Sequence, residues 1–172
     1  INKHKDKIHY QDINKINKGV FNALKKINDS PYLSVLITNQ PAVAKGIITD
    51  KKLNNDFERF SSILGSKKAY IDRLYYCPHH PERGFLGENK KFKVKCNCRK
   101  PKNGMLLKAI KDLNLNINKS YMVGDSFSDY LAAKKTKVKF IKVGKKKFSA
   151  NKNLISKKDL SSAVNFILEN PL

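Results

Sequence analysis

Two carboxylates follow a short apolar run in the second half of the chain. Residues 121–123 (Tyr-Met-Val) lead into Gly124, Asp125 comes next, and Asp129 stands four positions further on. Ligands of open α/β sheets bind at the carboxyl ends of the strands, and carboxylate oxygens are ligands that Mg²⁺ prefers. The pattern therefore predicts that Asp125 holds magnesium at a strand end. The alternative is that both carboxylates only cap the helix that follows.

The three cysteines all lie in one window together with a histidine. Cys77-x-His79 and Cys96-x-Cys98 supply three thiolates and one imidazole. Four such ligands fill a tetrahedron and leave no open position, so the pattern predicts a structural zinc ion. An odd number of cysteines clustered with histidine favours metal over disulfides, and hence a reducing cytosol.

The segment between the two ligand pairs, His80 to Lys95, is rich in Gly, Lys and Asn and has little apolar content. We expect that it cannot hold itself by a core and that zinc binding orders it. Two alternatives stay open: the cysteines are incidental, or His80 replaces His79 as the ligand.

Two further groups suit a phosphate. Thr38 and Asn39 end an apolar run that begins at Leu33, so the Thr38 hydroxyl and nearby backbone N–H groups are expected at the same sheet edge. Arg99 and Lys100 follow the second cysteine pair. Taken singly, Thr38-Asn39 is typical of an ordinary turn and Arg99-Lys100 of a solvated basic turn. Their order along the chain, each at a strand end or beside the metal ligands, favours a phosphate site.

The elements that position these groups follow from apolar spacing. A one-faced helix is expected from Ile13 through Ile16 to Ile27, and another is capped by Thr49 or Asp50, with Leu53, Phe57, Phe60 and Leu64 inside. Further helices are expected at 103–113, between 123 and 138, and from Leu160 to Leu168. Strands are expected at 33–38, 69–76, 120–123 and 138–143, with a loose polar connection from Lys145 to Ser156.

Strands that alternate with helices predict βαβ units and a parallel sheet. We interpret residues 1–172 as a single α/β domain, with residues 77–102 as an insertion built around metal. No apolar run reaches membrane-spanning length, which argues against a membrane partner.

The formal net charge of +22 raises the question of a nucleic-acid partner. Arginine is scarce, however, and Lys, Asn and Ile are all abundant, as in proteomes from AT-rich genomes. We therefore attribute the charge to composition and do not expect nucleic acid as a partner. The charge would still attract a phosphorylated substrate.

Read together, these motifs resemble the D,D-heptose 1,7-bisphosphate phosphatases, small cytosolic enzymes of the haloacid dehalogenase superfamily. The matching runs are Thr38-Asn39-Gln40, Lys45-Gly46, Cys77-Pro78-His79-His80-Pro81, Cys96-x-Cys98-Arg99-Lys100-Pro101, Gly104-Met105 and Tyr121-Met122-Val123-Gly124-Asp125. The resemblance implies a three-layer Rossmann-like fold without a large cap domain over the active site. The zinc-binding loop, residues 77–102, would take the place of that domain. It also implies a monomer and a role in making lipopolysaccharide precursors.

The same resemblance implies roles for individual residues. Asp125 would hold Mg²⁺, Thr38 and Lys100 would stabilise the transferring phosphoryl group, and Arg99 would grip the substrate, a small phosphorylated sugar. Asn39, Gln40 and Pro41 match positions that line the substrate pocket. The metal ligands Cys77, His79, Cys96 and Cys98 would hold a structural Zn²⁺.

One part of the family pattern, Asp-x-Asp-Gly-Thr, is not among these 172 residues. In the family it is followed by Ile-Asn, and this chain starts with Ile1-Asn2. The first Asp would form an aspartyl-phosphate, and the second would act as general acid and base. We therefore expect that the central strand is missing, that residues 1–172 alone are inactive, and that they fold poorly.

Several positions depart from the family pattern and leave the substrate open. His4-Lys5-Asp6-Lys7 replaces an Asp-His-Gly-Tyr type segment, and Pro41-Ala42-Val43 replaces a small Ser-Gly-Ile run. Lys45 replaces Arg, and Ser126 replaces Lys. One alternative is a histidinol-phosphate or other small-molecule phosphatase. A remoter one is a non-catalytic, zinc-bearing module that binds nucleic acid.

Overall fold

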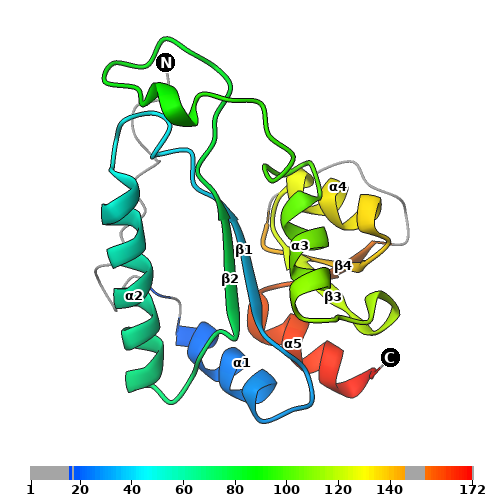
Figure 1. Cartoon of the computed structure of the whole chain (residues 1–172). Coiled ribbons are helices and arrows are strands. Elements are labelled where there is room, and N and C mark those ends of the chain that lie inside the picture. Colours follow the sequence, from blue (N-terminus) through cyan, green and yellow to red (C-terminus); the bar gives the residue numbers. More distant parts are fainter. Residues whose placement is uncertain (1–15, 17, 146–153, 172) are drawn as a thin grey trace.

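The strands of this protein are short and parallel, and they form two separate sheets. In the computed structural model, which describes residues 16, 18–145 and 154–171, β1 (Val35–Asn39) pairs with β2 (Arg73–Cys77). A second sheet has the order β3 (Tyr121–Gly124), β4 (Lys139–Val143) and β5 (Ile155–Lys157). Figure 1 shows the β1–β2 pair between α2 (Asp50–Ser66) on one side and the second sheet on the other. The predicted α/β class with parallel pairing is confirmed.

Helices cover both faces of the second sheet. Alternate side chains of a strand point to opposite faces, so Met122 and Phe140 pack with α3 (Gly104–Asp112) and α4 (Phe127–Thr136). Ile141 instead packs with α5 (Leu160–Glu169). This arrangement gives the three layers that were expected.

The first half of the chain is held by two further helices. In α1 (Lys18–Asn28), Ala23 and Ile27 pack against Val164 of α5. Helix α2 begins where predicted, because the Thr49 hydroxyl accepts a hydrogen bond from the Lys52 backbone N–H. All four side chains predicted for its inner face are buried: Leu53, Phe57, Phe60 and Leu64.

Some element boundaries differ from the sequence expectations. Leu33 is 50% exposed and lies before β1, and β2 starts at Arg73 rather than Ala69. The predicted loose connection contains β5, because Ile155 pairs with Ile141 and joins its apolar cluster. The predicted helix residue Ile13 lies outside the described residues. Single-turn 3₁₀ helices occur at Lys90–Phe92 and Ile117–Lys119.

No backbone ladder joins β1 to β3 in the described part of the chain. The expected position of the strand that carries Asp-x-Asp-Gly-Thr is between these two strands. The helices that the structure describes include none with the length and apolar character needed to cross a membrane.

Candidate active site

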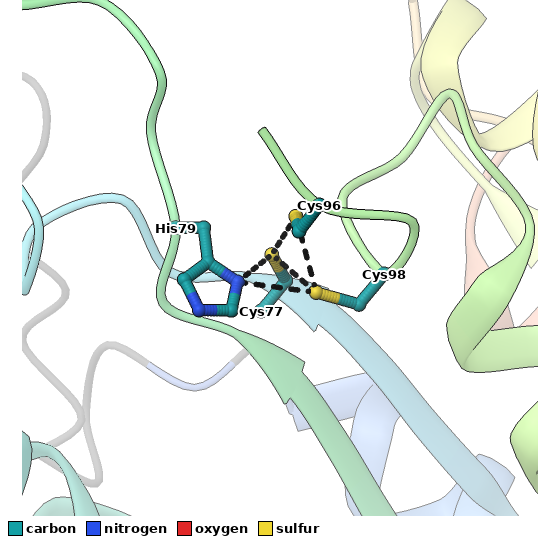
Figure 2. Close-up of side chains that lie close together, drawn as sticks. All are labelled: Cys77, His79, Cys96 and Cys98. Carbon is teal, nitrogen blue, oxygen red and sulfur yellow. Dashed lines mark hydrogen bonds between the residues drawn. The ribbon is translucent and has the colours of Figure 1, made fainter. Parts of the chain in front are cut away.

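The four predicted zinc ligands converge on one point (Figure 2). Cys77 ends β2, His79 lies two residues further on, and Cys96 and Cys98 occupy the turn before α3. The Cys98 sulfur lies 3.0 Å from that of Cys77 and 3.2 Å from that of Cys96, and His79 Nδ1 lies 3.3 Å from it. All four ligand atoms lie within 4.8 Å of one another.

This arrangement fits a tetrahedral metal. Zn–S bonds near 2.3 Å place sulfurs about 3.8 Å apart, so the cluster needs to expand only slightly around an ion. Burial raises the pKa of the Cys77 and Cys98 thiols, so both are neutral before a metal binds and lose protons when it does. His79, and not His80, faces the sulfurs. His80 instead packs edge-on against Phe85, with ring centroids 5.5 Å apart.

The end of β1 is hydrogen-bonded to this cluster. The Gln40 backbone N–H donates to the Cys77 carbonyl at 2.8 Å, just beyond the register pair of Asn39 and Cys77. The Gln40 side chain is fully buried and donates through Nε2 to the Thr38 hydroxyl at 3.2 Å. The Thr38 hydroxyl, which accepts this bond, keeps its own proton for donation to a ligand.

Lys100 connects the two sheets. Its ammonium donates to the Ile37 carbonyl of β1 at 2.8 Å and pairs with Asp129 of α4 at 2.6 Å. The two side chains are only 11% and 9% exposed. The Asn39 side chain holds the Lys100 backbone, since Oδ1 accepts from its N–H and Nδ2 donates to its carbonyl, both at 3.0 Å.

The two carboxylates after β3 have different surroundings. Asp125 is exposed, so its carboxylate is open to a ligand. Asp129 is buried and caps α4, accepting from the Ser126 hydroxyl at 2.7 Å and from the Ser126 backbone N–H at 3.2 Å. A Cβ at Gly124 would lie 2.6 Å from the Asp129 Cβ, so this approach needs glycine.

The capping role of Asp129 was anticipated, but its ion pair with Lys100 was not. The four-residue spacing from Asp125 places Asp129 in the first turn of α4, but it does not indicate Lys100 as a partner. Arg99 lies beside the metal cluster, where it donates to the His79 carbonyl at 3.2 Å, and it remains partly exposed. Pro41 opens the turn after β1 and is partly exposed as well.

The metal loop, residues 77–102, has more internal structure than its composition suggested. The Lys93 side chain is 1% exposed, and its ammonium lies 3.3 Å from Glu88 and 4.4 Å from the centre of the Phe85 ring. Glu88 also accepts from the backbone N–H groups of Gly84 and Phe85. A buried cation and an aromatic ring thus give this segment internal contacts that its composition did not predict, and that zinc binding orders it stays a prediction.

The loop tip also contacts the segment after β1. The Asn89 N–H donates to the Ala44 carbonyl at 3.0 Å. Gly46, with φ of +73°, approaches the backbone of Gly87 so closely that a Cβ would lie 1.7 Å from its carbonyl oxygen.

Comparisons with known proteins identify the family of this chain. Residues 97–163 match the family model described as HAD-hydrolase-like. A D-glycero-beta-D-manno-heptose-1,7-bisphosphate 7-phosphatase from Haemophilus ducreyi is 41% identical, over 80% of this chain and 75% of the relative. A protein of the same name from Pasteurella multocida is also 41% identical, over 74% and 68%.

Among solved structures, a D,D-heptose 1,7-bisphosphate phosphatase from B. bronchiseptica, complexed with magnesium and phosphate, superposes with a TM-score of 0.74. The match covers 89% of this chain and 83% of that one, at 22% identity. At that identity the likeness establishes the fold.

Proposed function

The chain belongs to the heptose-bisphosphate phosphatase family of haloacid-dehalogenase-type hydrolases, and from that premise we propose that the protein hydrolyses a phosphomonoester of a small sugar bisphosphate. The substrate that we propose is D-glycero-D-manno-heptose 1,7-bisphosphate, which the names of its relatives specify. The observation that carries the proposal is the position of Lys100. Its side chain is 11% exposed, and its ammonium lies between the end of β1 and Asp129. Asp129 is four residues past the exposed Asp125.

In this proposal each residue performs one task at the phosphoryl group. The Thr38 hydroxyl donates to a phosphoryl oxygen, and the Lys100 ammonium neutralises charge that develops during transfer. Asp125 would be a ligand of Mg²⁺, which neutralises phosphate charge when it is bound. The Arg99 guanidinium, which donates to the His79 carbonyl, is planar and has further N–H donors. It could therefore hydrogen-bond to the second phosphate or to a sugar oxygen.

The zinc ligands have a supporting role in the proposal. Zn²⁺ held by Cys77, His79, Cys96 and Cys98 would fix the segment that carries Arg99 and Lys100, without itself touching substrate. Because the thiols must stay reduced to bind metal, we place the protein in the cytoplasm.

The nucleophile belongs to the Asp-x-Asp-Gly-Thr motif, which these 172 residues do not contain. Its first Asp would attack phosphorus and break the bond to the sugar oxygen, which takes a proton from the second Asp, and water would then hydrolyse the acyl phosphate to inorganic phosphate. We therefore assign turnover to a polypeptide that includes this motif and expect none from residues 1–172 alone.

A direct assay tests the proposal. The protein is expressed from its complete gene, and Mg²⁺-dependent phosphate release is measured with heptose 1,7-bisphosphate, histidinol phosphate and a 3′-phosphorylated oligonucleotide. The proposal expects the highest kcat/KM for the bisphosphate and loss of turnover in Asp125→Ala. Preference for histidinol phosphate would support the alternative that Ser126 and Lys45 leave open. Turnover that survives Asp125→Ala would overturn the assignment.

A further inference from the structure

Two amide side chains follow Thr38, and both are used inside the protein. Asn39 ends β1 and Gln40 follows it, directly after the proposed phosphate ligand Thr38. Three of their hydrogen bonds are directed at the two residues that would hold the phosphoryl oxygens, Thr38 and Lys100.

Asn39 holds the backbone of Lys100 by a reciprocal pair of bonds. Its Oδ1 accepts from the Lys100 N–H and its Nδ2 donates to the Lys100 carbonyl, each at 3.0 Å. An amide that makes both bonds to one residue fixes the position and the orientation of that residue's backbone. The Lys100 ammonium is then directed to the Ile37 carbonyl and the Asp129 carboxylate.

Gln40 acts on the other group. Its side chain is fully buried, so it cannot reach a substrate in the open site. The Nε2 group donates to the Thr38 hydroxyl oxygen at 3.2 Å. An oxygen that accepts this bond directs its own O–H proton elsewhere, and the phosphoryl oxygen is the partner in the proposed reaction.

We propose that Asn39 and Gln40 are positioning residues, Asn39 for Lys100 and Gln40 for Thr38, rather than contacts to the sugar. This inference rests on the proposed function, because it concerns the groups that bind the transferring phosphoryl. It differs from the expectation that Asn39 and Gln40 line the substrate pocket. In the Thr-Asn-Gln sequence, Thr38 would then bind the phosphate. Asn39 and Gln40 would orient the two phosphate-binding residues, Lys100 and Thr38.

The first test does not depend on turnover. The protein expressed from its complete gene is treated with a limiting amount of an amine-reactive acetylating reagent. Mass spectrometry then compares the acetylation rate of Lys100 with that of Lys102. In Asn39→Ala the Lys100 rate should rise several-fold, because its backbone clamp is lost. Asn103→Ala is the matched control, since the Asn103 side chain makes no capping bond at the start of α3. An unchanged Lys100 rate in Asn39→Ala would overturn the inference.

The second test separates positioning from sugar binding. Misplacement of a catalytic group costs about 100-fold in rate, so Asn39→Ala and Gln40→Met should lower kcat by similar factors for the heptose bisphosphate and for p-nitrophenyl phosphate. Asn39→Asp, which keeps the acceptor for the Lys100 N–H, should recover part of the loss. A rise in KM confined to the bisphosphate would identify sugar contacts and refute positioning.

Double-mutant cycles complete the test. If Gln40 acts through Thr38, Gln40→Met should cost little once Thr38→Val is present, and Asn39→Ala should cost little once Lys100→Met is present. Additive losses would count against the inference. If the protein releases no phosphate from any substrate, the proposed function fails, while the acetylation rates still decide whether Asn39 holds Lys100.

Discussion

At the scale of single residues, the pair formed by Lys100 and Asp129 links chemistry to stability. Two charges taken out of water are costly unless each finds its partner. Here the lysine lies in the turn that follows the metal ligands, and the aspartate lies in the first turn of α4. The residue that would bind the phosphoryl group therefore also joins the two halves of the fold.

Replacement of Lys100 should expose both roles. Lys100→Met leaves the Asp129 carboxylate buried without its cation, which should lower the free energy of unfolding by about 3–5 kcal/mol. The same change should reduce kcat at least about 100-fold, because the developing charge loses a fixed cation. Urea titration and phosphate release measure the two effects. Lys102→Met is the control, and an equal loss in that variant would contradict the assignment.

Replacement of Arg99 should weaken binding of the heptose bisphosphate. Loss of a charged hydrogen bond costs about 1.5–3 kcal/mol, so Arg99→Ala should raise KM for the heptose bisphosphate about tenfold or more. The KM for p-nitrophenyl phosphate, which has one phosphate, should change little. Arg83→Ala, at an exposed position of the same loop, is the comparison. Equal effects on both substrates would show that Arg99 does not bind the distal part of the sugar.

The sequence predicted the metal cluster because its ligand types and their spacing are local to one segment of the chain. Cys77, His79, Cys96 and Cys98 were identified by type and spacing, and the structure brings them together. The Lys100–Asp129 pair joins residues far apart in the chain, and no periodicity encodes such a contact. The direction of the Asn39 amide was beyond prediction for the same reason.

At the scale of elements, the metal loop should depend on its zinc ligands. Cys98→Ser removes a thiolate that contacts the other ligands, so zinc content should fall and proteolysis should begin within residues 77–102. Metal analysis after gel filtration and mapping of the first cleavage sites check this. Lys95→Ala, at an exposed position beside Cys96, should keep its zinc and its protection. A Cys98→Ser protein with full zinc occupancy would argue for a different ligand set.

Gly46 should be essential to the contact between this loop and the segment after β1. A Cβ there would lie 1.7 Å from the Gly87 carbonyl oxygen, and φ of +73° disfavours other residues. Gly46→Ala should therefore destabilise the fold by about 1–3 kcal/mol.

Gly65 provides the matched control within α2. No atom would lie within 4 Å of a Cβ at that position, so Gly65→Ala should be neutral or stabilise by up to about 1 kcal/mol. Thermal unfolding of both variants measures the difference. An equally stable Gly46→Ala protein would mean that the loop tip does not rest on this segment.

Elements with a capped, one-sided apolar pattern were the most predictable. Helix α2 has both signals and was located to within a residue of its start. Strand β5 has only three residues and lies at the sheet edge, and Ile155 alone marks its inner side. Its existence depends on pairing with β4, which is a tertiary contact.

At the scale of the whole molecule, the described residues form two sheets with no shared ladder. A strand edge without a partner leaves backbone groups unsatisfied and exposes the core beside it. We expect residues 1–172 alone to unfold over a broad temperature range. The same residues preceded by the Asp-x-Asp-Gly-Thr strand of the Haemophilus ducreyi relative should unfold sharply. Circular dichroism melts compare the two, and a sharp transition for residues 1–172 alone would contradict this.

The way the metal loop is fastened has a consequence for engineering. The four proposed zinc ligands would fix its two ends, and the glycine contact and the Asn89 bond fix its tip, while Glu82 and Arg83 between them are exposed. Randomising these two positions should alter what flanks a bound sugar and leave the scaffold intact. Changes at these two loop positions could therefore alter the substrate range without altering the fold.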